Sequence, residues 1–203
     1  MLGVEHFGID VKPEGSAYRQ LRENLKRIEA VKSIWTIGHS TRSAAEFKEI
    51  LLLNQIEALV DVRSFPGSRR YSHFNKAELA ANLEAAGILY AHNPQLGGRR
   101  GPSPTSRNTA WQNASFRAYA DHMETEEFAE GIAQLLEVAT TKRTAIMCAE
   151  ALWWRCHRSL IADYLKAHGV QVIHILAANK TEEHPYTSAA RIIDGRLSYE
   201  GLF

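Results

Sequence analysis

The sequence is poor in the features that mark several classes of protein. It has only two cysteines, Cys148 and Cys156, too few for the disulfide framework of a small secreted domain. No apolar run reaches the roughly 18 residues that a membrane span needs, and the first thirty residues are rich in charge, unlike a secretory signal peptide. We therefore expect a cytoplasmic protein that does not enter a membrane and whose thiols are reduced.

An excess of charge of one sign is also missing. The formal net charge is +1, which argues against a protein that binds nucleic acid or a membrane surface by electrostatics alone. The arginines are nevertheless unevenly distributed, and six of them cluster in the middle of the chain: Arg63, Arg69, Arg70, Arg99, Arg100 and Arg107. The sequence thus predicts a local basic patch on a nearly neutral protein.

Apolar runs alternate with helical patterns over most of the chain. The runs that read as strands are 33–37, 57–62, 87–90, 144–148 and 170–176. Helical spacing of apolar residues follows Ser43 and Asn75, recurs over 111–122 and 125–139, and marks a helix from about Arg155 to His168. Alternating strands and helices predict right-handed crossovers and a parallel sheet. We expect an α/β fold with three layers, Rossmann-like, with a mostly parallel sheet of about five strands.

The two ends of the chain differ from this pattern. Residues 1–15 lack periodicity and read as an arm, and a helix from Ser16 to about Ala30 carries one apolar stripe. We expect residues 1–32 to pack as an added arm and helix on a single α/β domain of residues 33–203. The tail from Ala177 is polar, with a short hairpin expected around Asp194 and Gly195.

Chemically reactive residues follow four of the predicted strands. Since the carboxyl ends of parallel strands meet at one edge of a sheet, these residues should converge there. The set is His39 and Ser40 after the first strand, Asp61, Arg63 and Ser68 after the second, Gly97, Gly98 and Arg99 after the third, and Cys148, Glu150, Cys156, His157 and Arg158 after the fourth.

Three chemistries fit this set. Cys156, placed in the first turn of the predicted helix beside His157, would be an activated thiolate nucleophile. Cys148, Cys156 and His157 are ligand types that bind a divalent metal, and with carboxylates they would suit iron, manganese or zinc. Arg63, Arg99 and Arg158 would bind a phosphate or carboxylate group.

Purely structural interpretations stand beside these. Asp61 could simply pair with Arg63, and a cysteine at the end of an apolar strand, such as Cys148, is most often an inert core thiol. The residues from Cys148 to Arg158 could also form a network that locks the last helix onto the sheet.

Several separate segments resemble the domain of unknown function 488 family. They are Thr36–Ser40, Val60–Ser68, Leu96–Gly98, Phe116–Asp121, Met147–Glu150 and Cys156–Arg158, in order and without a large gap. The resemblance runs from about Ile34 to about Tyr199 and implies a bacterial-type, cytosolic α/β domain, but no reaction and no cofactor. Its motifs carry over onto the convergent strand-end residues named above, Arg99 excepted, and onto Gly38 and Pro66.

The preferred functional hypothesis is an enzyme acting on a phosphate-bearing or otherwise anionic substrate, related to a nucleotide or nucleic acid. His39, Asp61, Glu150, Cys156 and His157 would be catalytic. Ser40, Arg63, Ser68, Gly97, Gly98, Arg99 and Arg158 would bind the anion. The alternative is a non-enzymatic module that binds a nucleotide or nucleic acid through the same arginines. The sequence fixes neither a cofactor nor the oligomeric state.

Overall fold

The computed structural model describes residues 27–201 and contains a six-stranded sheet. Its strands are β1 (Ser33–Gly38), β2 (Ala58–Asp61), β3 (Leu89–His92), β4 (Thr144–Cys148), β5 (Gln171–Ala177) and β6 (Lys180–Glu183). Their order is β3-β2-β4-β1-β5-β6, and the first five are mutually parallel. The expected α/β fold with a mostly parallel sheet is confirmed, and β6 adds an antiparallel edge strand that the sequence did not predict.

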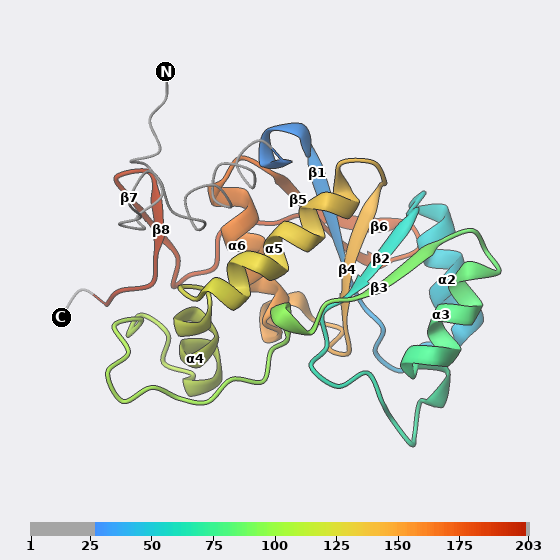
Figure 1. Ribbon diagram of the computed structural model, residues 1–203, viewed down its shortest axis with the longest axis horizontal. Coiled ribbons are helices and arrows are strands. Elements are labelled where there is room, and N and C mark those ends of the chain that lie inside the picture. Colours follow the sequence, from blue (N-terminus) through green and yellow to red (C-terminus); the bar gives the residue numbers. More distant parts are fainter. Residues whose placement is uncertain (1–26, 202–203) are drawn as a thin grey trace.

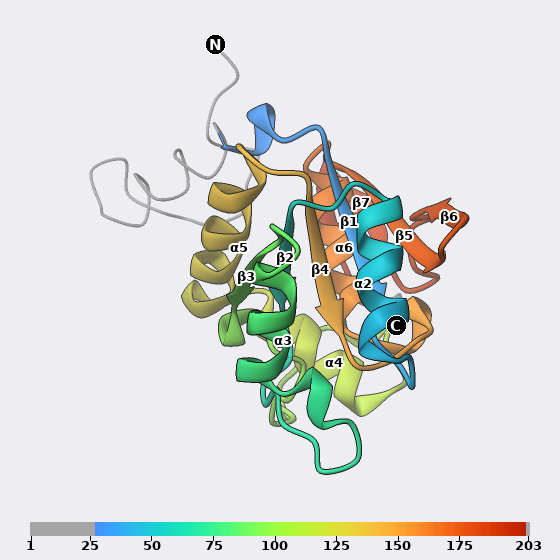
Figure 2. The ribbon, with the colours of Figure 1, turned by 90° about the vertical axis from the view of Figure 1, so that its right-hand side faces the viewer.

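Helices cover both faces of this sheet. They are α2 (Ala44–Leu53), α3 (Lys76–Glu84), α4 (Ala114–His122), α5 (Glu126–Ala139) and α6 (Arg158–Ala167). In Figure 1, α2 and α3 lie to the right of the sheet and α4, α5 and α6 to its left, and the turned view of Figure 2 shows α2 in front of β1. None of the helices in the described part of the chain has the length and apolar character needed to cross a membrane.

Alternating side chains of the strands feed two separate cores. Leu59, Ala145 and Met147 pack with α2 and α3. Their neighbours Val60 and Ile146 pack with α5 and α6 on the other face. Because both faces of the central strands are covered, the strands read as continuous apolar runs, as the sequence indicated.

Two predicted helix starts are confirmed by capping bonds. Ser43 precedes α2 and accepts a hydrogen bond from the Glu46 amide, and Thr125 does the same for Phe128 at the start of α5. Asn75 also precedes a helix, α3, but its side chain accepts from the Ser68 amide instead.

The start of α6 corrects the sequence prediction. Trp153–Arg155 form a separate 3₁₀ turn, and the α-helix begins only at Arg158. Cys156 has an extended backbone (φ −131°, ψ 145°), so it precedes the helix, and His157 is its N-cap residue rather than part of its first turn. Cys156 is therefore not a residue of the first helical turn that the N-terminus of α6 activates, as the sequence suggested.

The ends of the chain are only partly described. Residues 27–30 are helical, and Ile28 and Val31 are buried in the core beneath α5 and α6. The predicted arm and most of the predicted helix from Ser16 lie outside the described residues, and the domain boundary at residue 32 stays a prediction. In the tail, β7 (Arg191–Ile193) and β8 (Arg196–Ser198) form the expected hairpin, with Asp194 and Gly195 both at positive φ.

The strand order creates a switch point beside β4. The chain leaves β1 and β2 toward helices on one face, whereas it leaves β4 toward α6 on the other face. Since β4 lies between β1 and β2, the connections diverge at the carboxyl ends of these three strands. Ligand sites of open α/β sheets typically form at such a point.

Candidate functional site

The backbone closes tightly where β1 and β4 end. The amides of His39 and Ser40 donate to the carbonyls of Cys148 and Ala149, each at 2.9 Å. A Cβ on Gly38 would stand 2.0 Å from the Glu150 carbonyl oxygen, so only glycine lets the two segments approach this closely. Ser40 then turns the chain with a left-handed φ of 53°.

Asp61 and Arg63 form a closed, buried ion pair after β2. The guanidinium donates from Nε to Asp61 Oδ1 at 2.8 Å and from Nη2 to Oδ2 at 2.6 Å. Tyr90 donates to the same carboxylate at 2.7 Å, and Arg63 also donates to the Phe74 carbonyl. The hydrogen bonds and charge of Asp61 raise the pKa of Arg63 against the opposing effect of burial. Each charge of this pair is neutralised by the other.

His39 packs against this pair as a neutral base. Its ring stacks on Phe74 at 4.1 Å between centroids, and its Nδ1 lies 2.9 Å from the Ser40 carbonyl, to which it donates. Nε2 is then the acceptor that faces Arg63 Nη1 at 3.2 Å. Burial lowers the pKa of His39 to about 4.

The two cysteines and His157 converge where β4 ends. Their ligand atoms all lie within 4.8 Å of one another, and Cys156 Sγ is 3.6 Å from His157 Nδ1. The hydrogen bond between the thiols raises the pKa of Cys148 and lowers that of Cys156, which makes Cys156 the more acidic thiol. Cys148 is partly exposed and Cys156 is buried.

Arg158 lies behind this cluster, only 1% exposed. It donates from Nε to Cys156 Sγ at 3.4 Å, from Nη1 to Thr36 Oγ1 at 3.3 Å, and from Nη2 to the Glu150 carbonyl. Within residues 27–201 no carboxylate forms an ion pair with it. A buried guanidinium without a carboxylate makes the surroundings of Cys156 electropositive.

A relay of hydrogen bonds extends from Arg158 into the core. Thr36 Oγ1 lies 2.7 Å from His174 Nδ1, His174 Nε2 lies 2.9 Å from His184 Nδ1, and His184 Nε2 lies 3.0 Å from Asp163 Oδ1. Because Asp163 can only accept, and a neutral imidazole has one donor and one acceptor nitrogen, every step donates in one direction when both rings are neutral, from Arg158 to Asp163. Burial lowers the pKa of His174 to about 2, consistent with a neutral ring.

The loop after β3 closes the site from the third side. A Cβ on Gly97 would lie 2.5 Å from Ser64 Oγ, and one on Gly98 would lie 2.4 Å from His157 Nδ1. Both glycines are thus positions of close approach. The Tyr119 ring contacts His157 at 5.0 Å between centroids, so the imidazole is held between Gly98 and Tyr119.

Other residues expected at the site take outer positions. Ser68 Oγ accepts from the Tyr71 amide, which shapes the turn before α3. The exposed Glu150 carboxylate accepts from the Leu152 amide. Arg99 is exposed, its amide donates to Ser64 Oγ, and its guanidinium lies 5.5 Å from the centre of the Phe65 ring.

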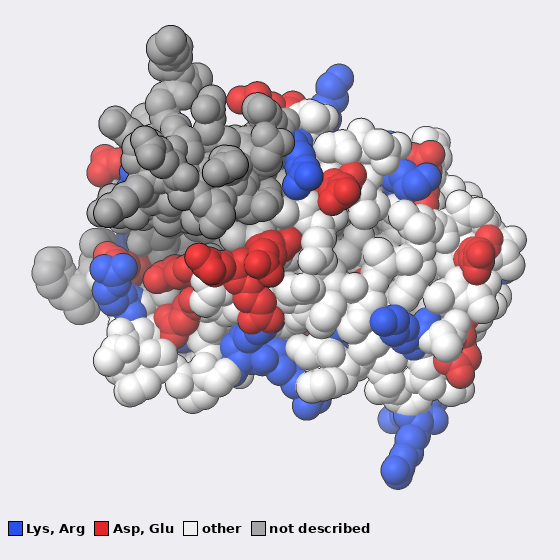
Figure 3. All heavy atoms as spheres, in the orientation of Figure 1, with Lys and Arg blue, Asp and Glu red and all other residues white. Residues whose placement is uncertain are grey.

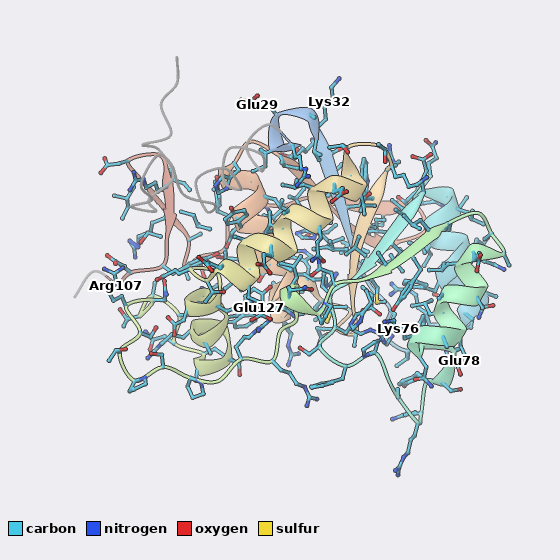
Figure 4. The ribbon with its side chains drawn as sticks, in the orientation of Figure 1. Glu29, Lys32, Lys76, Glu78, Arg107 and Glu127 are labelled. Carbon is cyan, nitrogen blue, oxygen red and sulfur yellow. The ribbon has the colours of Figure 1, made fainter. Side chains whose placement is uncertain are left out.

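The loops along this edge are strongly basic. Segments 62–75, 93–113 and 149–157 hold three, three and one arginines, seven in all, against a single carboxylate, Glu150. Figure 3 shows Lys and Arg side chains along the lower rim of the molecule. The labels of Figure 4, in the same orientation, help to locate this rim. Lys32, just before β1, is at the top, and Lys76, at the start of α3, is in the lower half.

Sequence reasoning missed several polar residues that support the site. Tyr90, Thr36, His174, His184 and Asp163 all belong to the networks described above. A signal existed for His174, which interrupts the apolar run 172–176 and therefore needs a buried partner. No comparable signal marked Thr36, because threonine is common in strands.

One comparison with known proteins found a match, to a family model. The family model described as domain of unknown function DUF488 matches residues 43–165, more than half of the chain. The matched segment begins shortly after Ser40 and includes Asp61, Gly98 and the residues from Cys148 to Arg158. No curated protein and no solved structure matches the chain. The chain therefore belongs to the DUF488 family of domains of unknown function.

Proposed function

We propose that this protein is an enzyme that acts on a phosphate-bearing or otherwise anionic substrate at the carboxyl ends of β1, β2 and β4. The observation that carries the proposal is the charge of this edge. Seven arginines and one carboxylate occupy its three loops. Carboxylates outside these loops pair with Arg63, Arg100 and Arg107, so the excess positive charge comes from Arg69, Arg70, Arg99 and Arg155. A further guanidinium, Arg158, is buried against a thiol and has no carboxylate partner among residues 27–201. Such a surface attracts anions and leaves positive charge to be neutralised by a ligand.

Exposed and buried arginines would have different roles at this site. Arg99 is exposed and would contact the anion directly, because its guanidinium lies at the surface beside Phe65. Arg63 and Arg158 are buried and engaged by protein groups. Arg158 would stabilise the bound anion through its charge from behind the surface rather than by direct contact. The charge of Arg63 is neutralised by Asp61, so Arg63 would hold its loop in place.

The reacting groups would come from the cluster after β4. Cys156 and His157 are in contact, and the exposed part of the cluster is Cys148 together with His157. His157 would move a proton at Nδ1, the ring atom that faces the sulfur. His39 and Asp61 would orient the loops, since their polar atoms are already bound to Arg63.

A second candidate function is a non-enzymatic module that binds a nucleotide or nucleic acid. Phe65, 71% exposed, favours it, because an exposed aromatic ring beside Arg99 offers a platform on which a base can stack. Trp154, 49% exposed in the loop after β4, is a further aromatic surface.

Calorimetric titration with inorganic pyrophosphate tests the anion site. Wild type should bind, Arg99→Ala should bind at least about tenfold more weakly, and Lys142→Ala should match wild type. Lys142 is the control because it removes an exposed positive charge just before β4, at the opposite edge of the sheet. Equal binding by all three proteins would contradict the anion site.

A turnover assay then separates enzyme from binding module. Wild type and Cys156→Ala would be incubated with a panel of phosphorylated nucleosides and sugars, and the products identified by mass spectrometry. A product that forms with wild type and not with Cys156→Ala supports the enzyme. Tight binding of a nucleotide without turnover, weakened by Phe65→Ala, supports the binding module.

A further inference from the structure

The three donor atoms at the end of β4 have the spacing of a metal site. Tetrahedral zinc, with Zn–S of about 2.3 Å and Zn–N of about 2.0–2.1 Å, holds a sulfur and a nitrogen ligand about 3.5 Å apart. Cys156 Sγ and His157 Nδ1 are 3.6 Å apart, and Cys148 Sγ lies within 4.8 Å of both. Little movement would bring all three onto one ion.

His157 is prepared to be a ligand. Its Nε2 lies 3.1 Å from the Val62 carbonyl, which can only accept, so Nε2 carries the hydrogen. The lone pair is then on Nδ1, the atom that faces Cys156. Metal-binding histidines are typically oriented in this way, with the other ring nitrogen donating to a carbonyl or carboxylate.

The protein also fixes the plane of this ring. A Cβ on Gly98 would be 2.4 Å from Nδ1 and nearly equally far, 2.8 and 2.9 Å, from Cγ and Cε1. Such a position lies over the face of the ring and not along the lone pair. Gly98 therefore packs against one face and Tyr119 against another side, which leaves the edge that bears the lone pair free toward the sulfurs.

The charge around the cluster suits a cation bound by two thiolates. Two thiolates and one divalent ion sum to zero, and Arg158, which donates to Cys156 Sγ, adds one positive charge. An N–H donor on a ligand sulfur is a usual outer-shell contact. The remaining positive charge would be met by an anionic fourth ligand.

We propose that Cys148 Sγ, Cys156 Sγ and His157 Nδ1 bind one Zn²⁺ and leave its fourth position for water or an anionic oxygen of the substrate. Two thiolates and an imidazole favour zinc over harder ions such as Mg²⁺. Cys148 and His157 are partly exposed, so the fourth position faces the basic edge. This role of the fourth position rests on the proposed anion site, whereas zinc binding itself does not. With Nδ1 bound to the ion, His157 would be a ligand and would not be the group that moves a proton.

The test is metal analysis of the full, untagged chain. Protein would be expressed with added zinc, purified anaerobically with a phosphine reductant, and its reduced thiols counted. We expect one zinc per chain, lost in Cys148→Ser, Cys156→Ser and His157→Gln and retained in His73→Gln, a histidine of the neighbouring loop after β2. Gly98→Ala, which shifts the ring, should lower zinc affinity by about 10- to 100-fold.

A cobalt titration keeps the result independent of how the variants fold. Zinc-free wild type should take up one Co²⁺ with a thiolate-to-cobalt charge-transfer band and the intense ligand-field bands of tetrahedral cobalt, both abolished by added zinc. Reduced, folded wild type that binds neither ion stoichiometrically overturns the proposal. So does uptake that is unchanged in folded Cys156→Ser.

Pyrophosphate titration of the same samples separates the two proposals. Zinc binding with pyrophosphate affinity unaffected by Arg99→Ala would preserve the metal site and refute the anion site. Pyrophosphate binding that depends on Arg99 in a protein unable to hold zinc would do the reverse. If both hold, loading with zinc should tighten pyrophosphate binding in wild type and not in Cys148→Ser.

Discussion

Two arginines are buried at the same edge of the sheet, and their surroundings differ. Arg63, after β2, meets Asp61 in a two-point ion pair that Tyr90 completes. Arg158, after β4, meets a thiol, a hydroxyl and a carbonyl. A neutralised pair can hold a loop in place without any ligand, whereas a buried cation without an anion is stable only if something else supplies the charge. The contrast separates a structural network from a candidate reactive one.

Breaking the pair after β2 should have the largest effect on stability. Asp61→Asn and Arg63→Met each leave one buried charge without its partner, which typically costs about 3–5 kcal/mol. Urea unfolding followed by circular dichroism would measure the loss. Tyr90→Phe is the matched control, since it removes one hydrogen bond to the carboxylate and should cost about 1.5–3 kcal/mol. Losses below 1 kcal/mol in both charge variants would contradict the structural role.

Arg158→Met should lower the free energy of unfolding by less than Arg63→Met does, but it should impair function more. Arg158→Met leaves no buried carboxylate behind, only a thiol, a hydroxyl and a carbonyl without a donor, so a loss of about 1–3 kcal/mol is expected. Loss of the N–H bond to Cys156 should lower zinc affinity by about 10- to 100-fold. Unfolding and zinc competition would be measured on Arg63→Met and Arg158→Met together. The comparison fails if Arg158→Met proves the less stable protein with unchanged zinc affinity.

The sequence could predict that these two networks would lie near each other, but not how they would differ. Apolar runs followed by Asp61 and by Cys148 located two strand ends, and parallel strands bring their ends to one edge. Which partner each arginine receives depends on the order of the strands. β3 places Tyr90 beside Asp61, and β1, between β4 and β5, carries Thr36 between Arg158 and His174. That order is set by packing across the whole sheet.

Two elements of the fold escaped prediction for a local reason. β6 has the sequence Lys-Thr-Glu-Glu on the edge of the sheet, where no face is buried and no hydrophobic alternation arises. α6 begins at Arg158 because Cys156 and His157 are held by contacts with Cys148 of β4, with the Val62 carbonyl after β2 and with Gly98 after β3, which local helix propensity does not register. The family resemblance pointed to residues at the strand ends without indicating either feature.

The relay of hydrogen bonds behind Arg158 ends on a carboxylate and therefore belongs in the comparison with Arg63. Its expected effect, on the pH dependence of stability, is smaller than those above. His174 faces Thr36, His184 and the stacked Trp153, whose indole donates to Glu182, and Arg158 lies close by. Burial is the main cause that lowers its pKa from 6.5 to about 2, and the charge of Arg158 adds to this effect. Between these values the unfolded chain binds a proton that the folded protein excludes. Stability should therefore fall as the pH drops below about 6.5.

The contribution of His174 to this slope can be isolated by substitution. One proton changes the free energy of unfolding by about 1.4 kcal/mol per pH unit once the unfolded histidine is protonated. His174→Gln should lose that part of the slope between pH 6 and 4, and unfolding at pH 8 would give the cost of the substitution itself, because neither form is then protonated. Parallel slopes for the two proteins would mean that the folded relay accepts a proton. Arg158 would then face a second cation, a charge that the thiols or a bound anion would have to offset.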